Sequence, residues 1–302
     1  MQESPRRPSP LPWRASHLLW PALTTGIACA ALGAHAQALP PPRALDTSRP
    51  AASAPPTDPR ALPGSCLHKK CFDDAEEHTE PPLAKAPSSP HEAIVALANA
   101  RGLACTGTLI APSVVLTARH CLPLIHARLG RDATAPAEVI PVVASRVPPL
   151  RLVDLALLKL SRPTTVSPLP LRTATDTMAP TDPLRLIGYG AIDPSGERSL
   201  GRRHFADVHP RGWGCDAQTS ATSGCIPDLE MLIGRGARND TCSGDSGGPV
   251  LETTDQGLRI VAVTSRAVRD ALLRCGDGGI YTRTDRLSTW IHTTARQLET
   301  PP

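Results

Sequence analysis

A nine-residue segment in the last third of the chain carries the residues best suited to covalent chemistry. It reads Thr-Cys-Ser-Gly-Asp-Ser-Gly-Gly-Pro over residues 241–249, which places Ser246 among glycines. A serine hydroxyl is a poor nucleophile at neutral pH and needs a positioned base that takes its proton. The segment therefore predicts a nucleophilic serine that is served by a histidine and an acid from elsewhere in the chain.

One way to supply these partners is the nucleophile elbow of esterase-type α/β-hydrolases, whose Gly-x-Ser-x-Gly pattern is met by Gly244, Ser246 and Gly248. That arrangement needs a helix after the serine and has its acid and histidine downstream. Here Gly248-Pro249 and the apolar run behind it favour a strand, and only 56 of the 302 residues follow Ser246. The order of residues along the chain therefore argues against an esterase-type hydrolase.

The other way places both partners upstream of the serine, and both are present. His120 ends the segment Leu-Thr-Ala-Arg-His over residues 116–120, directly before Cys121, and Asp154 opens the apolar run 154–160. Asp132 is the alternative acid, but no apolar run follows it. The chain thus has a histidine, an aspartate and a serine in that order, the set that nucleophilic catalysis by serine requires.

These three motifs, in this order, resemble the trypsin/chymotrypsin-like serine peptidases over about residues 91–298. The resemblance implies that His120 acts as general base, that Asp154 holds the imidazole in the correct tautomer, and that Ser246 attacks the substrate carbonyl. It assigns the oxyanion hole to the backbone N–H groups of Gly244 and Ser246. It implies neither a metal nor an organic cofactor.

The resemblance extends to the residues that bind substrate. In trypsin-like members an aspartate six residues before the nucleophile lies at the base of the specificity pocket, and Asp240 stands there. A buried carboxylate at this place pairs with Arg or Lys, so cleavage after these residues is expected. Gly279 matches a pocket-wall glycine, and Ser265 matches a serine that supports the catalytic aspartate. Where the family usually continues with Trp-Gly, this chain has Arg266 and Ala267.

A second departure concerns activation. Zymogens of this family are usually cut before a sequence like Ile-Val-Gly-Gly, and the new ammonium group pairs with the aspartate before the nucleophile, here Asp245. No such sequence precedes Cys105, and Ile94-Val95 is too close to Cys105 and belongs to the first strand. Two explanations stay open: a cut near Lys70 or Lys85, or another partner for Asp245.

The N-terminal segment reads as an export signal. Arg6, Arg7 and Arg14 precede an apolar run over residues 18–33, and Ala34-His35-Ala36 has the small-x-small form of a cleavage site. We therefore expect residues 1–36 to be a cleaved signal peptide and the protein to be secreted, to the periplasm or the medium. A retained N-terminal anchor is the alternative.

The cysteine count fits an oxidised, exported chain. Of nine cysteines, loss of the signal peptide removes Cys29 and leaves eight, an even number. The family resemblance implies two bridges, Cys105–Cys121 beside the histidine and Cys242–Cys275 beside the specificity pocket. Cys215–Cys225 and Cys66–Cys71 remain by elimination, and these last two pairings can be exchanged. The irregular spacing around Cys66 argues against a zinc site.

The elements that must position these residues begin only at about residue 88. Seventeen of the 34 prolines fall within the first 90 residues, so residues 37–87 read as a Pro/Ala-rich pro-region or linker with a small Cys66/Cys71 island. Residues 88–302 form the expected serine protease domain. Its short apolar runs are separated by Gly, Pro, Asp and Ser, and they indicate an all-β fold. They lie at 93–98, 107–110, 114–117, 139–143, 154–160, 184–188, 249–251, 258–264 and 279–282.

The resemblance refines this to two packed six-stranded antiparallel β-barrels with the site between them. A C-terminal helix is expected within residues 285–298, with Leu287, Trp290, Ile291 and Leu298 on one face. The formal net charge of +4, which falls to +2 without residues 1–36, gives no sign of a nucleic-acid or membrane-surface partner. The expected partners are protein or peptide substrates and protein protease inhibitors. We expect a monomer without stable membrane association after signal cleavage.

The sequence therefore predicts a secreted serine endopeptidase. The alternative from another class is an inactive protease homologue that serves as a binding module. Such homologues typically lack a residue of the triad, whereas this chain keeps His120, Asp154 and Ser246. The altered residues at 266–267 and the missing activation sequence are the features that favour the alternative.

Overall fold

The computed structural model describes residues 71–72, 89–173, 183–192, 200–209, 214–234, 240–273 and 275–300. All of them belong to one compact unit within residues 58–302. The expected signal peptide 1–36 lies outside the described residues. So do Cys66, Lys70 and Lys85, and strand β1 (Cys71–Phe72) is the only described part of the expected pro-region 37–87.

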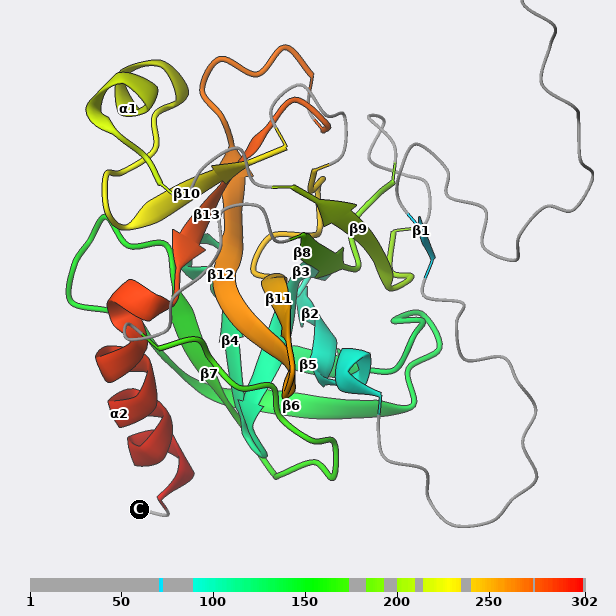
Figure 1. Ribbon diagram of the computed structural model, residues 1–302. Coiled ribbons are helices and arrows are strands. Elements are labelled where there is room, and N and C mark those ends of the chain that lie inside the picture. Colours follow the sequence, from blue (N-terminus) through cyan, green and yellow to red (C-terminus); the bar gives the residue numbers. More distant parts are fainter. Residues whose placement is uncertain are drawn as a thin grey trace, which may run out of the picture. The chain divides into compact units, whose positions relative to one another are not determined.

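The first half of the described domain is a closed six-stranded barrel (Figure 1). All neighbouring strands are antiparallel, and the order around the barrel is β2-β3-β4-β7-β6-β5. Its centre is filled by aliphatic residues such as Leu97, Leu116 and Leu158, which are almost wholly buried. The strands are β2 (Ile94–Asn99), β3 (Gly102–Ala111), β4 (Val114–Thr117), β5 (His126–Leu129), β6 (Glu138–Arg146) and β7 (Ala156–Leu160).

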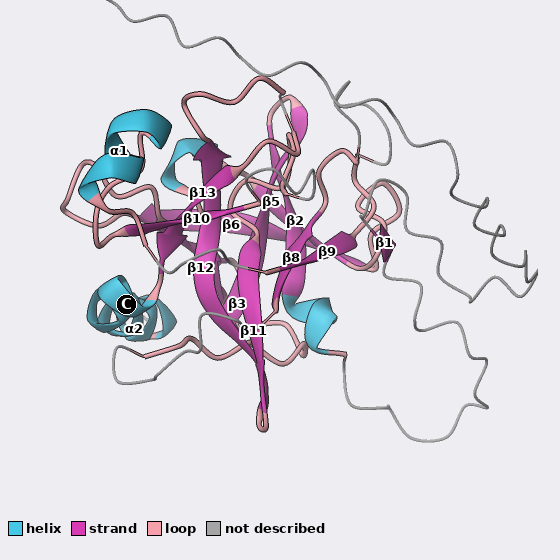
Figure 2. Ribbon diagram, turned by 45° about the horizontal axis from the view of Figure 1, so that its top comes forward, coloured by secondary structure: helices cyan, strands magenta, loops and turns pink. Residues whose placement is uncertain are grey.

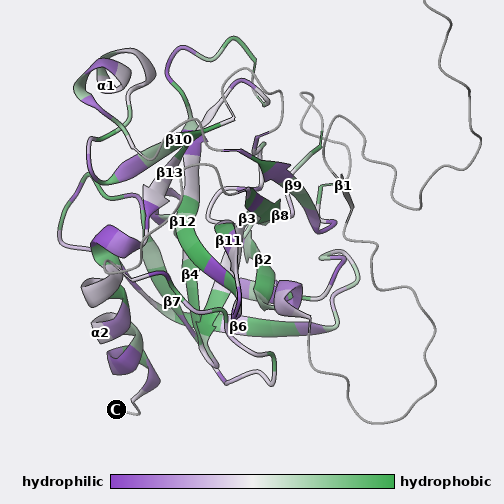
Figure 3. Ribbon diagram, in the orientation of Figure 1, coloured by the Kyte–Doolittle hydropathy of each residue, from purple (hydrophilic) through white to green (hydrophobic). Residues whose placement is uncertain are grey.

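The second half is a seven-stranded antiparallel sheet, seen from another side in Figure 2. Its order is β1-β9-β8-β11-β12-β13-β10, and its own core includes Leu184, Val250 and Tyr281. Figure 3 shows the apolar stretches of β2, β8 and β12 in the centre of the two sheets. The strands are β8 (Leu184–Gly188), β9 (His204–Val208), β10 (Glu230–Ile233), β11 (Pro249–Thr254), β12 (Gly257–Ala267) and β13 (Gly279–Arg283), besides β1.

Two α-helices complete the described part of the chain. Helix α1 (Ala217–Ser223) begins at Asp216, whose carboxylate accepts the N–H of Thr219, and ends at Gly224 with a φ of 79°. Helix α2 (Ser288–Glu299) packs against β3, β4 and β7 through a face that buries Ile291 and Leu298. Three 3₁₀ turns lie at Pro90–Ala93, Arg119–Cys121 and Asp285–Leu287.

The predicted fold is confirmed: an all-β domain with a closed six-stranded barrel, a second antiparallel sheet and a C-terminal helix. β1 adds a seventh strand to the second sheet by pairing with β9. Sequence patterns missed β5, β9 and β10, since polar residues such as His126, Asp207 and Glu230 interrupt these short strands. Among the described residues, no helix is long and apolar enough to cross a membrane.

Candidate active site

His120 and Asp154 are brought together by the pairing of two strands in the first barrel. β4 ends at Thr117 and pairs with β7, in which Ala156 stands opposite Thr117. The 3₁₀ turn after β4 carries His120, and the residues before β7 carry Asp154, so both side chains emerge at the same end of the barrel. Nδ1 of His120 lies 2.7 Å from Oδ2 of Asp154, and the backbone N–H of His120 donates to Oδ1 at 2.9 Å.

The second sheet completes the surroundings of Asp154. Oγ of Ser265, in β12, donates to Oδ2 of Asp154 at 2.6 Å, which is the contact expected from the sequence. Burial on its own raises the pKa of the Asp154 carboxyl, yet the hydrogen bonds from His120 and Ser265 outweigh it and hold the pKa below its ordinary value. Asp154 therefore stays ionised at neutral pH, as is needed to orient an imidazole and stabilise its protonated form.

Asp132 is not the partner of His120. Its carboxylate accepts the N–H and the hydroxyl of Thr134, at 2.8 and 2.6 Å, and the side-chain hydrogen bond is the main reason that its pKa is lowered. The acid beside His120 is therefore Asp154.

Ser246 sits in a loop that a residue of the first barrel holds in place. Thr106, in β3, donates its N–H to the carbonyl of Ser246 at 2.8 Å and its hydroxyl to the carbonyl of Gly244 at 2.9 Å. The Ser246 carbonyl also lies 3.8 Å from Sγ of Cys121, the residue after His120. Thr106 was not singled out in the sequence, because a threonine after a cysteine carries no distinguishing signal.

Among the described residues, the structure shows no hydrogen bond between the Ser246 hydroxyl and His120, and Cys121 links their surroundings because its Sγ lies 3.8 Å from the Ser246 carbonyl. Nε2 of His120 lies 3.9 Å from Sγ of Cys121. In enzymes without bound substrate, catalytic hydrogen bonds are often long and tighten only in the complex. The structure therefore shows a histidine oriented by an aspartate, next to the cysteine whose Sγ lies near the Ser246 carbonyl.

Some backbone N–H groups around Ser246 donate a hydrogen bond to a carbonyl, and others have no acceptor among the described residues. Asp245 donates to Cys242, Gly247 donates to Thr264, and Gly248 donates to Asp245. Within the described part of the chain, the N–H groups of Gly244 and Ser246 meet no acceptor. Gly244 has a φ of +98°, which favours glycine, and a Cβ there would come within 2.8 Å of Gly190. Two unpaired donors beside a serine are what an oxyanion requires.

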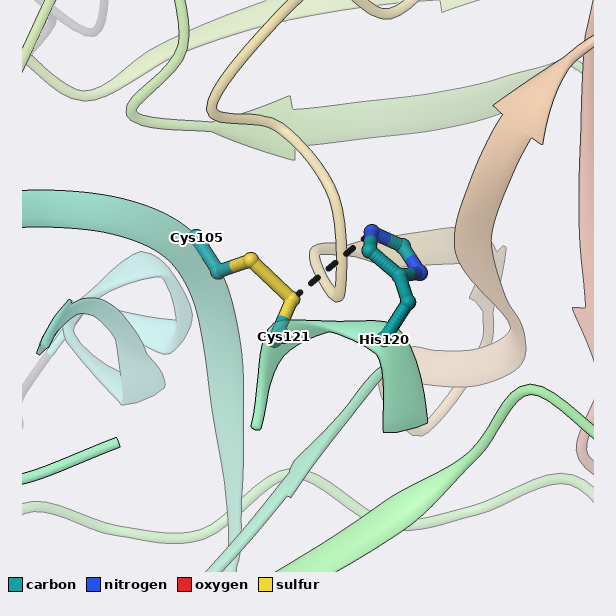
Figure 4. A group of neighbouring side chains, drawn as sticks. All are labelled: Cys105, His120 and Cys121. Carbon is teal, nitrogen blue, oxygen red and sulfur yellow. Dashed lines mark hydrogen bonds between the residues drawn. A yellow bond between two sulfur atoms is a disulfide. The ribbon is translucent and has the colours of Figure 1, made fainter. Parts of the chain in front are cut away.

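Figure 4 shows a group that superficially resembles a metal site, formed by Cys105, His120 and Cys121. The two sulfur atoms are joined in a disulfide, so neither is a thiolate that can bind a metal. Nδ1 of His120 is occupied by Asp154. This group therefore offers one ligand at most, and its role is to fix the histidine loop to β3.

Comparison with known proteins agrees with this geometry. The family model for trypsin matches residues 83–291, more than half of the chain. The chain belongs to the trypsin family. The venom plasminogen activator Haly-PA of Gloydius brevicauda is 28% identical over 220 residues, which are 67% of this chain and 81% of that protein. The structure of neuropsin, a serine protease expressed in the limbic system of mouse brain, matches with a TM-score of 0.58 and 25% identity over 69% of this chain and 97% of neuropsin.

The two disulfides implied by the family resemblance and the Cys215–Cys225 pairing that remained by elimination are all formed. They join Cys105 to Cys121, Cys215 to Cys225, and Cys242 to Cys275. The first ties the histidine loop to β3, and the third ties the nucleophile loop to the segment before β13. The expected fourth bridge involves Cys66, which lies outside the described residues.

Asp240 is buried beside the disulfide Cys242–Cys275. Its carboxylate accepts the N–H groups of Gly276 and Gly278, the second at 2.6 Å. Gly279 follows, and a Cβ there would lie 2.6 Å from the hydroxyl of Tyr281. Burial, together with the negative charge of Asp240, raises the pKa of Tyr281, so this hydroxyl stays neutral. The three residues thus form one buried polar group around the predicted pocket.

The residues that depart from the family pattern find partners here. Arg266 makes two hydrogen bonds to the buried carboxylate of Glu230, at 2.6 and 2.8 Å, and a third to the carbonyl of Gly224 at 2.9 Å. The guanidinium thereby ties β12 to β10 and to the end of α1. Nη1 of Arg119 lies 3.4 Å from the carbonyl of Arg151. Glu230 could not be predicted as the partner of Arg266, because its contact is set by the pairing of distant strands.

Proposed function

We propose that this protein is an exported serine endopeptidase that cleaves peptide bonds after Arg or Lys through an acyl-enzyme intermediate. His120 takes the proton of the Ser246 hydroxyl as it attacks the carbonyl, and then returns it to the leaving amine. Asp154 keeps Nδ1 protonated and stabilises the imidazolium. The N–H groups of Gly244 and Ser246 bind the oxyanion.

The observation that carries this proposal is the combination of a formed acid–base pair with two unpaired backbone donors. The His120–Asp154 contact of 2.7 Å supplies the base, and the N–H groups of Gly244 and Ser246 supply the donors. An inactive binding module needs neither. Membership of the trypsin family supports protein substrates and protein protease inhibitors as partners.

Asp240 supports the preference for Arg and Lys. Its carboxylate is almost wholly buried, and the N–H groups of Gly276 and Gly278 hold it in place. A buried carboxylate in a fixed orientation pairs well with a guanidinium or ammonium group, through hydrogen bonds that the opposite charges strengthen. Export is supported by the charged and apolar N-terminal segment, by the disulfides, and by a relative that is named as a venom protein.

Labelling with a fluorophosphonate probe tests the mechanism. Wild-type protein should react, and Ser246→Ala should not, because the probe needs the activated hydroxyl. Hydrolysis of an Arg-ending peptide amide should fall on the order of 10⁶-fold in the same variant. Ser243→Ala is the matched control, since Ser243 is an exposed serine of the same loop, and it should label like the wild type.

A Phe-ending amide serves as the specificity control in the same assay and should be a poor substrate. Folded, oxidised protein that fails to label even after mild proteolytic treatment would instead identify the chain as a binding module. Its altered residues Arg266 and Ala267 would then mark the first surface to study.

A further inference from the structure

Asp245, the residue before the nucleophile, is contacted by a histidine that comes from inside the fold. Nε2 of His204, in β9, lies 3.4 Å from Oδ1 of Asp245, and both side chains are almost wholly buried, at 3% and 2% exposed. The N–H of Gly190 donates to the same oxygen at 2.8 Å, and the N–H of Cys242 donates to Oδ2 at 2.8 Å. The carboxylate is thus enclosed by donors.

Both ring nitrogens of His204 face an oxygen atom. Nδ1 lies 3.1 Å from the carbonyl oxygen of Arg202, and Nε2 faces the carboxylate of Asp245. Both oxygens are acceptors only. A neutral imidazole would point a lone pair at one of them, whereas the imidazolium donates to both. The geometry therefore gives both ring nitrogens an oxygen acceptor, at 3.1 Å and 3.4 Å.

Glycines in the surrounding backbone leave room for the contact between His204 and Asp245. His204 stands between Gly188 of β8 and Phe72 of β1 in the ladders of the second sheet. A Cβ at Gly188 would lie 2.1 Å from Oδ1 of Asp245, and a Cβ at Gly190 would lie 2.6 Å from the same atom. Glycine at both positions allows the carboxylate to approach β8 closely enough to meet the ring.

Asp245 stands directly between the two oxyanion donors, so whatever fixes its carboxylate fixes them. Its N–H donates to Cys242 and its carbonyl accepts from Gly248, which closes the loop on both sides of Ser246. The N–H groups of Gly244 and Ser246 stay available in the presence of the His204 contact. The pair is therefore compatible with a competent oxyanion hole rather than with a distorted one.

There is little room for a new chain end at this place. The cavity bordered by His204, Asp240 and Asp245 has a volume of only about 10 Å³, which is about the space of one water molecule. The one Ile-Val pair before Cys105, Ile94-Val95, lies within β2 and pairs with β3. Among the described residues, His204 is the side chain that borders this cavity together with Asp240 and Asp245 and contacts the Asp245 carboxylate.

We propose that His204 is a positioning residue that supplies the cation for Asp245, so that the single chain is catalytically competent without a newly cut amino terminus. The inference rests on the proposed serine peptidase function and deepens it. It answers the question that the sequence left open, namely which group takes the place of the activation ammonium.

Two substitutions of His204 test this role with the full secreted chain. His204→Ala should lower kcat/KM for an Arg-ending amide on the order of 10²-fold, comparable with loss of an oxyanion donor. Imidazole at millimolar concentration should restore part of this activity, because it fits the space of the lost ring and donates to Asp245. A purely structural defect would not respond to imidazole. His204→Gln keeps roughly the size of the side chain and one N–H donor but cannot carry a positive charge. Its activity should therefore lie between that of the wild type and that of His204→Ala.

His91→Ala is the matched control, because His91 packs near Phe205, the neighbour of His204, with ring centroids 6.2 Å apart. Its activity should equal that of the wild type and should not change with imidazole. If either folded His204 variant is as active as the wild type, or more active, the proposal is wrong. Increased activity would mean that His204 is a latch that holds the chain inactive.

The intact chain provides an independent measurement. Wild-type protein with an unprocessed chain, checked by mass spectrometry, should react with the fluorophosphonate probe at Ser246. Reaction that appears only after a cut, in proportion to the new amino terminus, would overturn the role of His204 while leaving the proposed function standing. No reaction under either condition would refute the proposed function itself.

Discussion

The two halves of the described domain position their share of the candidate site by different physical means. The first barrel is closed, and it holds His120 and Asp154 through strand pairing around an aliphatic core. The second sheet presents Ser246 on an irregular loop, which depends on a disulfide, on closely approached glycines and on buried charges such as Asp240 and Asp245. One half uses hydrophobic packing, and the other uses satisfied polar groups.

Each half also contributes one hydroxyl to the other. Thr106 of the barrel binds the carbonyls of Gly244 and Ser246, and Ser265 of the sheet binds Asp154. The candidate catalytic groups are therefore held relative to one another by hydrogen bonds that cross between the halves, in addition to an apolar cluster to which both halves contribute. This comparison predicts that Asp154 of the barrel affects the turnover of every substrate, whereas Asp240 of the second half affects the choice of substrate.

The largest effect is expected from Asp154→Asn in the barrel. The amide keeps the shape of the side chain but cannot accept from Nδ1 in the same way, so His120 is held in the wrong tautomer and kcat should fall about 10⁴-fold. Turnover of both Arg-ending and Phe-ending amides should decrease by the same factor, as measured at pH 7. Asp132→Asn is the control, and it should leave both rates unchanged. A loss limited to one substrate would break the proposed division of roles.

Asp240→Ser in the second sheet should give the opposite pattern. Cleavage after Arg should fall about 10²–10³-fold through loss of the buried charge, while the rate of fluorophosphonate labelling should change little. The new hydroxyl would offer one oxygen to two N–H groups that now share a carboxylate, so a lower thermal unfolding midpoint is expected as well. The ratio of kcat/KM for Arg-ending and Phe-ending amides, measured in wild type and variant, tests whether Asp240 sets the preference for Arg.

Asp277→Ser is the matched control, since Asp277 is an acid of the neighbouring loop whose carboxylate accepts the N–H of Leu272 at 2.5 Å. It should leave the preference for Arg intact. An Asp240→Ser variant with unchanged preference would show that Asp240 serves the backbone of the loop and not the substrate.

Much of the barrel could be predicted from the sequence, and less of the second sheet. The run 114–117 corresponds to β4 and the run 184–188 to β8, because continuous buried segments leave a clear apolar pattern. β9 and β10 carry the buried polar residues His204 and Glu230, and these read as loop residues until their partners are known. Hydrophobic patterning therefore identifies elements that pack by burial and misses those that pack by pairing charges.

The residues of the candidate site differed in the same way in how far the sequence could predict them. Motif order identified His120, Asp154 and Ser246 as candidates, since local spacing around each residue is distinctive. Thr106 and His204 were not found, because each acts through contacts with residues far away in the sequence. Arg266 was recognised as a departure from the family pattern, but its hydrogen bonds to Glu230 depend on the register between strands.

The smallest expected effect concerns Ser265, the hydroxyl that joins the two halves at Asp154. Ser265→Ala removes the 2.6 Å hydrogen bond and should lower kcat only about tenfold, because the contact to His120 remains. The pKa of Asp154 should rise toward its ordinary value in this variant. A depressed carboxyl pKa stabilises the fold above the unfolded value near pH 4, and this stabilisation is lost as the pH falls through the lower folded value.

Urea unfolding at pH 7 and at pH 3 should therefore show a stability difference between wild type and Ser265→Ala that shrinks at the lower pH. Ser223→Ala is the control, because the buried hydroxyl of Ser223 donates to the carbonyl of Thr219 and serves no carboxylate. The decrease in the free energy of unfolding caused by Ser223→Ala should be the same at both pH values. If the cost of Ser265→Ala is equally independent of pH, the hydroxyl contributes packing alone, and the two halves are joined at Asp154 by His120 without help from the second sheet.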